Sequence, residues 1–210
     1  EPGPNLVNNG GFESRSPEVK TWDQLGRASG WSNANGGSVD VFSKLGSKKN
    51  VGIPDNELGS STAQEGDSYG GFVAWKDDQR PNFKRLGNGR DEQPYKAAWN
   101  QYSEYLQTAI SSPLTPGQKY DITMWVKLAD KSDRAVNGIG AYCSPTQLSY
   151  AHRHHLVELA DVKSQTVLDN KKDWVEVKGT FVADGDEKFL VIGAFGPNME
   201  KKTVKEGADN

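Results

Sequence analysis

Five aromatic residues are of the types that bind sugars. They are Trp75, Trp99, Tyr102, Tyr105 and Trp125. Four of them lie near the ends of a long polar segment of the chain, and the fifth lies on the polar side of a predicted strand. Sugars stack on aromatic faces, and ligand sites combine such apolar walls with a few polar groups. Residues 76–100, which are rich in charge, Asn, Gly and Pro, supply polar groups beside these aromatics. The pattern predicts a site for a polysaccharide ligand. The alternative is that the aromatics pack in the core beneath this segment.

A second candidate is a short histidine cluster. His152, His154 and His155 are the only histidines of the chain, and they fall within four residues. Imidazole is a common zinc ligand, but zinc sites need further ligands, and no cysteine lies near the cluster in sequence. A solvated loop is therefore the favoured interpretation. The single cysteine, Cys143, is expected to be a small buried hydrophobic residue and not a nucleophile.

Catalytic motifs are absent from the sequence. It contains no G-x-S-x-G, no H-E-x-x-H, no P-loop and no G-x-G-x-x-G before a helix. No pair stands out among the 28 Asp and Glu residues as the acid and base of glycoside hydrolysis. We therefore expect a protein that is not an enzyme.

Composition limits the partners and the fold. The net charge is -3 and no basic block is present, so nucleic acid is not an expected partner. No apolar stretch approaches the length of a membrane span. The chain of 210 residues carries 23 Gly and 10 Pro, which favours many short strands joined by turns.

Alternating residues predict the elements that would position these side chains. Residues 119–127 alternate with a period of two, which is typical of a half-buried strand. Further strands are predicted at 5–8, 38–42, 69–75, 102–108, 174–182 and 189–195. The turn 184–186 predicts that the last two form a hairpin. Residues 151–160 fit either one helical turn or a strand.

These strands predict an all-β fold, an antiparallel β-sandwich. One domain is expected over residues 1–198, with long loops at 44–66 and 76–100. Residues 199–210 are rich in Lys and Glu, and we expect them to form a charged tail or linker.

Four segments of the chain together form a recognisable pattern. They are residues 5–14 (NLVNNGGFES) followed by Gly30 and Trp31, then residues 63–69 (AQEGDSY), 114–126 (LTPGQKYDITMWV) and 173–181 (DWVEVKGTF). In order and spacing they resemble the carbohydrate-binding modules of the family 4, 9 and 22 group. That resemblance implies a jelly roll with a galactose-binding-like fold.

A second set of segments gives a closer match. It comprises residues 51–56 (VGIPDN), 104–107 (EYLQ), 128–132 (LADKS) before Ile139 and Gly140, and 192–195 (IGAF). These resemble the N-terminal domains of OmpA-like cell-envelope proteins of the Bacteroidetes. In such proteins a peptidoglycan-binding domain normally follows.

The resemblance also implies a structural calcium site. Carried over by position, the ligands are the Gly11 carbonyl, the Glu13 carboxylate, the Glu65 carboxylate and the Ser68 carbonyl. Ca²⁺ takes six to eight oxygen ligands of these kinds. The aspartate that the family's closing strand adds has no counterpart in these 210 residues. The alternative is that Glu13 and Glu65 are solvated acids that hold a turn through backbone N–H groups.

The resemblance implies a function as well. We expect a non-catalytic, extracytoplasmic binding or attachment domain of a bacterial cell-envelope protein, located in the periplasm, on the outer membrane surface or in the secreted fraction. Its partner would be a cell-envelope protein or a glycan. The alternative is a carbohydrate-binding module that targets a secreted polysaccharide-degrading enzyme. Aromatics lining an open groove would favour the module, and buried aromatics would favour the attachment domain.

Overall fold

The computed structural model describes residues 3–81 and 95–204, with the backbone alone for 77–81 and 95–101. Within these residues the chain forms fifteen β-strands, one 3-10 turn at Leu25–Arg27 and no α-helix. All strand pairs are antiparallel apart from one isolated parallel bridge. The predicted all-β class is therefore confirmed.

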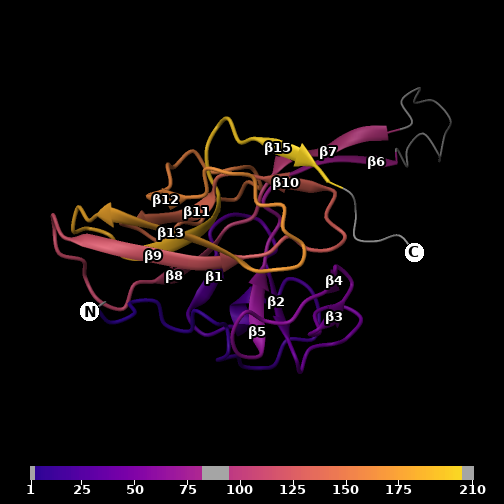
Figure 1. Cartoon of the computed structure of the whole chain (residues 1–210), viewed down its shortest axis with the longest axis horizontal. Coiled ribbons are helices and arrows are strands. Elements are labelled where there is room, and N and C mark those ends of the chain that lie inside the picture. The colour runs from indigo at the N-terminus through magenta and orange to yellow at the C-terminus, as the bar shows by residue number, and fades with distance from the viewer. Residues whose placement is uncertain (1–2, 82–94, 205–210) are drawn as a thin grey trace.

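Two sheets face each other across an apolar layer. The larger contains β1 (Trp31–Asn33), β8 (Leu106–Ala109), β14 (Phe189–Ala194), β11 (Ile139–Ser144) and β12 (Val162–Lys163), in that order. The smaller pairs β9 (Lys119–Val126) with β13 (Val175–Val182). Ile122 of β9 packs against Ala141, Cys143 and Leu190 of the larger sheet. This arrangement is sandwich-like, and Figure 1 shows β9 and β13 lying in front of β8, β11 and β12.

A second core lies beside the sandwich and is built mainly from the first third of the chain. Here β2 (Asp40–Ser43) pairs with β5 (Ser68–Gly71), below the sandwich in Figure 1. The buried side chains of this core include Phe12, Val19, Trp31, Phe42 and Val51. Leu106 of β8 also belongs to this cluster, which joins the N-terminal segment to the five-stranded sheet.

Three short pairs complete the described part of the fold. They are β3 (Asp55–Asn56) with β4 (Gly59–Ser60), β6 (Lys76–Pro81) with β7 (Tyr95–Tyr102), and β10 (Arg134–Val136) with β15 (Lys201–Thr203). Figure 1 shows β6 and β7 extending away from the body of the molecule.

The predicted hairpin of 174–182 with 189–195 is wrong. Strand β13 pairs with β9, whereas β14 lies between β11 and β8 in the other sheet. The intervening turn carries the chain from one sheet to the other. Glu187 fixes that turn by accepting hydrogen bonds from the backbone N–H groups of Asp184 and Gly185.

Other expected boundaries also differ. The expected loops contain strands, since 44–66 includes β3 and β4 and 76–100 includes β6 and part of β7. The expected tail contains β15, which pairs with β10. Short or highly charged strands lack the apolar alternation that marks a half-buried strand, so the pattern missed them. Residues 5–8, predicted as a strand, contribute only one isolated bridge, between Val7 and Ile110. Residues 151–160, for which a helical turn and a strand were both considered, form neither.

Candidate functional site

Tyr105 packs on the outer face of the five-stranded sheet, the face that is turned away from β9 and β13. Its side chain is fully buried against Gly193 of β14, where a Cβ atom would lie 2.2 Å from the tyrosine ring. The hydroxyl donates to the carbonyl of Ala194 and accepts from the backbone N–H of Leu156. Burial raises the pKa of Tyr105 to about 12. Tyr105 was predicted to bind a ligand, but in this arrangement its side chain is part of the core and a ligand cannot reach it.

Residues 145–161, which we call the strap, cover the same face. Leu148 and Leu156 of the strap pack on buried side chains of the sheet. The side chain of Gln107 of β8 forms two hydrogen bonds with the backbone of Leu148, as a neighbouring strand would. Its Nε2 donates to the Leu148 carbonyl at 2.7 Å, and its Oε1 accepts from the Leu148 N–H at 2.9 Å. The centre of the five-stranded sheet is thus buried on both faces.

Trp125 lies on the opposite side of the sandwich. Ile122 and Met124 of β9 face the interior, so Trp125 between Met124 and Val126 points outward, and it is 44% exposed. Its cross-strand neighbour on β13 is Glu176. Because Trp125 and Tyr105 lie on the outer faces of different sheets, the predicted aromatics do not line one groove.

Of the remaining predicted aromatics, Tyr102 is buried and Trp75 is half-buried. Tyr102 is 9% exposed, and burial, followed by its hydrogen bond to Glu104, raises its pKa to about 12. Trp75 is half-buried, its Nε1 has no hydrogen-bond partner among the described residues, and the Lys201 ammonium lies 4.8 Å from its ring. Trp99 lies in β7, and its side chain falls outside the described part of the structure.

A buried carboxylate, which was not among the predicted site residues, organises this region. Glu104 is 3% exposed. Its Oε1 accepts from the Ser38 N–H at 2.9 Å and from the Tyr102 hydroxyl, and its Oε2 accepts from the Val73 N–H at 2.8 Å. Buried charges persist where hydrogen bonds satisfy them. The available signal was its place in the predicted strand 102–108, where Glu104 shares one face with Tyr102 and Leu106.

A second carboxyl lies near this network. Burial raises the pKa of Asp40 to about 7, with the charges of Glu104 and Asp23 acting in the same direction. The backbone N–H of Asp23 donates to Asp40 Oδ1 at 2.6 Å, which opposes the shift. Asp40 therefore changes charge near neutral pH, and nothing in its sequence context indicated this.

Three of the four residues that were predicted to bind calcium lie together. Glu13 Oε1 accepts from the Asp67 N–H at 2.8 Å, and Glu13 Oε2 accepts from the Ser68 hydroxyl at 3.2 Å. A Cβ atom at Gly11 would lie 3.6 Å from Glu13 Cγ, so the opening turn also adjoins this carboxylate. The fourth, Glu65, is exposed. Glu13 thus holds a turn through a backbone N–H, which was the alternative to metal binding.

Arg15 fills the space among these oxygens. Its side chain is 7% exposed, and Nη1 lies 3.7 Å from Glu13 Oε2 while donating to the Phe12 carbonyl and the Ser68 hydroxyl. Its Nε donates to Glu18 at 2.8 Å. A guanidinium is a permanent cation, so positive charge already lies at this position. As they lie, these groups bind the Arg15 guanidinium, and calcium binding stays a prediction.

The histidines lie on the exposed side of the strap. The rings of Tyr150, His152 and His154 stack in series, with centroids 5.0 and 5.6 Å apart. The Tyr150 hydroxyl donates to Glu158 Oε1. Among residues 3–81 and 95–204, no group of three or more His, Cys, Asp or Glu side chains could hold a metal ion.

Cys143 lies in the apolar layer between the sheets and is 6% exposed. Burial raises the pKa of its thiol to about 12, and the nearby charges of Asp161 and Glu187 act in the same direction. Since the thiolate is the nucleophilic form, the raised pKa disfavours nucleophilic reaction of this cysteine at neutral pH. The prediction of a small buried hydrophobic residue is confirmed.

Comparisons with protein-family models, with curated proteins and with solved structures found no match to the chain. Within the described residues, no helix has the length and apolar character needed to cross a membrane.

Proposed function

We propose that this chain is a non-catalytic, extracytoplasmic attachment domain of a bacterial cell-envelope protein, with jelly-roll, galactose-binding-like topology. The burial of the outer face of the five-stranded sheet carries the proposal. Tyr105, Gln107 and the strap occupy the face on which a sugar chain would otherwise lie. The domain would therefore bind its partner through exposed side chains on its loops and strand edges.

One observation favours a carbohydrate-binding module as a second candidate. Trp125 is 44% exposed on a strand whose outward neighbours Asp121 and Thr123 are also exposed. An exposed indole with polar neighbours is a suitable platform for one sugar ring. It differs from the predicted site, because the other four aromatics lie elsewhere.

Co-sedimentation with isolated envelopes of a Bacteroidetes bacterium tests the attachment function. We expect the domain to sediment with the envelopes, to lose binding when they are pretreated with protease, and to keep it after periodate oxidation of their glycans. Loss of binding after periodate alone would exclude a protein partner. Failure to sediment with any envelope fraction would overturn the proposal.

Affinity electrophoresis in soluble polysaccharides tests the second candidate. The variant Trp125→Ala removes the platform, and Val182→Ala removes an apolar side chain that is 56% exposed on the neighbouring strand. Retardation of the wild-type protein and of Val182→Ala, but not of Trp125→Ala, would establish sugar binding at Trp125. Equal migration of all three in every gel would remove the candidate.

A further inference from the structure

A small pocket opens where three connections meet at one end of the five-stranded sheet. Its walls are the turn between β10 and β11 at Asn137 and Gly138, residues 163–165 at the end of β12, and residues 195–199 after β14. Its volume is about 250 Å³. At roughly 30 Å³ for each water, it holds about eight waters, which is the scale of one sugar ring.

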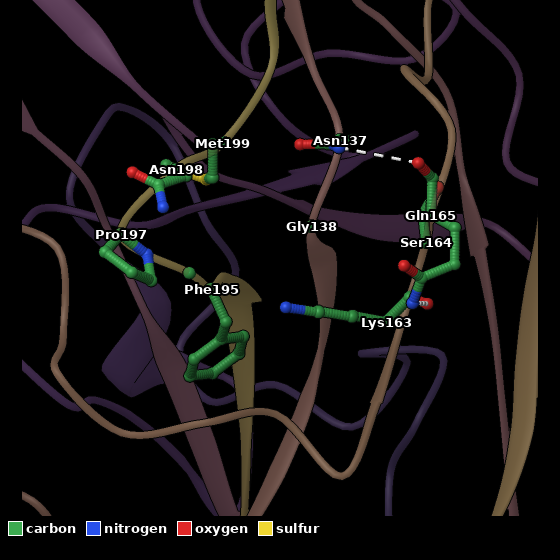
Figure 2. Close-up of a pocket in the computed structure, with 10 residues that line it drawn as sticks. Asn137, Gly138, Lys163, Ser164, Gln165, Phe195, Pro197, Asn198 and Met199 are labelled. Carbon is green, nitrogen blue, oxygen red and sulfur yellow. Dashed lines mark hydrogen bonds between the residues drawn. The ribbon is translucent and has the colours of Figure 1, made fainter.

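The pocket carries a positive charge. Lys163 is its only charged lining residue, and none of the lining residues is acidic. No ion pair or hydrogen bond of the Lys163 ammonium occurs within residues 3–81 and 95–204. Figure 2 shows this side chain extended across the pocket toward Phe195 and Pro197. Gly196 leaves room for it, since a Cβ atom there would lie 3.4 Å from Nζ.

Hydrogen bonds fix the walls in place. The Asn137 carboxamide accepts from the Glu200 N–H at 2.8 Å and donates to the Gln165 carbonyl at 3.4 Å, the bond drawn in Figure 2. The Gly138 N–H donates to the Ser164 carbonyl at 2.9 Å, and the Phe195 N–H donates to the Gly138 carbonyl at 2.8 Å. A site that is already ordered loses little entropy when a ligand binds.

We propose that this pocket binds the carboxylate group of an acidic monosaccharide unit, with Lys163 as the counter-ion. One lysine without an arginine suits a singly charged carboxylate better than a phosphate, which favours several donors or a bidentate arginine. The exposed side chains of Gln165 and Asn198 at the rim provide amides for sugar hydroxyls. The site goes beyond the attachment function and does not depend on it.

Titration of the ¹⁵N-labelled protein with D-glucuronate, followed by amide chemical shifts, tests the proposal. A ligand of this size in a shallow site is expected to bind with a Kd of about 1 mM. Shifts should be confined to residues 137–138, 163–165 and 195–199. D-Glucose, which has the same ring without the carboxylate, and acetate, which has the carboxylate without the ring, should each bind at least about tenfold more weakly.

Two variants and a matched control locate the interaction. Lys163→Met should weaken glucuronate binding at least about tenfold, because it removes the charge and keeps the length of the side chain. Gln165→Ala, at the exposed rim, should weaken binding severalfold. Lys119→Met, which removes an exposed lysine of β9, should bind like the wild type. The proposal is overturned by unchanged binding in Lys163→Met, by equal affinity for glucose or acetate, or by the absence of saturable shifts in the pocket.

Discussion

The ring of Tyr105 lies directly on the backbone of Gly193, and a Cβ atom at that glycine would be 2.2 Å from the ring. Gly193→Ala should therefore force the buried ring to move. We expect the free energy of unfolding to fall by about 1–3 kcal/mol, the usual cost of overpacking a core. Urea denaturation followed by tryptophan fluorescence measures the change.

Gly26→Ala is the matched control, since a Cβ atom at Gly26 meets nothing within 4 Å. Its free energy of unfolding should stay close to that of the wild type. A Gly193→Ala protein as stable as Gly26→Ala would show that Tyr105 is not held against the sheet.

Gln107 should control how firmly the strap is held. Gln107→Ala leaves the buried N–H and C=O groups of Leu148 without partners, which costs about 1–3 kcal/mol. Limited proteolysis should then cut within residues 145–161 faster than in the wild type. Val157→Ala, at a position of the strap that is 86% exposed, is expected to leave the cleavage rate unchanged. Equal rates in both variants would contradict the role given to Gln107.

The Arg15 contacts and a calcium site lead to opposite predictions for how a chelator changes the melting temperature. Because the guanidinium already supplies positive charge to Glu13 and Ser68, we expect excess chelator to leave the melting temperature unchanged. Arg15→Met should lower the free energy of unfolding by about 1–3 kcal/mol, since it leaves partly buried acceptors unpaired. Thermal melts with and without chelator measure both effects.

Lys44→Met is the control for Arg15→Met. Lys44 pairs with Asp67 close to the same turn, but both side chains are more than half exposed. Such a surface pair contributes at most about 1 kcal/mol. A melting temperature that falls by several degrees on chelation in the wild type would support the calcium site implied by the resemblance.

Asp40 should make stability depend on pH near neutrality. Its pKa is raised from 3.8 to about 7 by burial, so the folded state binds the proton more tightly than the unfolded state. The stabilisation is complete below the unfolded pKa of 3.8 and is lost as pH rises through about 7. We expect the free energy of unfolding to decrease by roughly 2–4 kcal/mol from this group between about pH 4 and pH 8.

Asp40→Asn should flatten this dependence, because asparagine can still accept the hydrogen bond from Asp23 and does not ionise. Denaturation curves at several pH values compare the two proteins. Parallel pH profiles for wild type and Asp40→Asn would contradict the shifted pKa.

The sequence predicted those parts of the fold that are encoded locally. Residues 119–127 and 174–182 alternate because one face of each strand is buried, and the structure has strands at 119–126 and 175–182. Which strands pair is not a local property, so the turn at 184–186 suggested a hairpin where the chain crosses between sheets. The charged strand β6 carries no apolar alternation, so the sequence predicts a loop there.

Which side chains of the candidate site are buried was harder to predict, because burial depends on contacts between segments that are far apart in sequence. Tyr105 and Trp125 look alike as aromatic residues on or near strands, yet only Tyr105 is covered by the strap. Arg15 joins Ser68, which is 53 positions away, and no local pattern indicates that contact. The burial of Cys143 was predicted correctly because a lone thiol follows the general preference of cysteine for burial.

The strap also limits what its covered face can bind. Lifting it would expose Leu148 and Leu156, and burying each such side chain contributes about 1.5–3 kcal/mol. The uncovered form would then be populated at less than about one molecule in a hundred. Any ligand that requires this face would bind at least about a hundredfold more weakly than its intrinsic affinity, because each association must wait for that rare form.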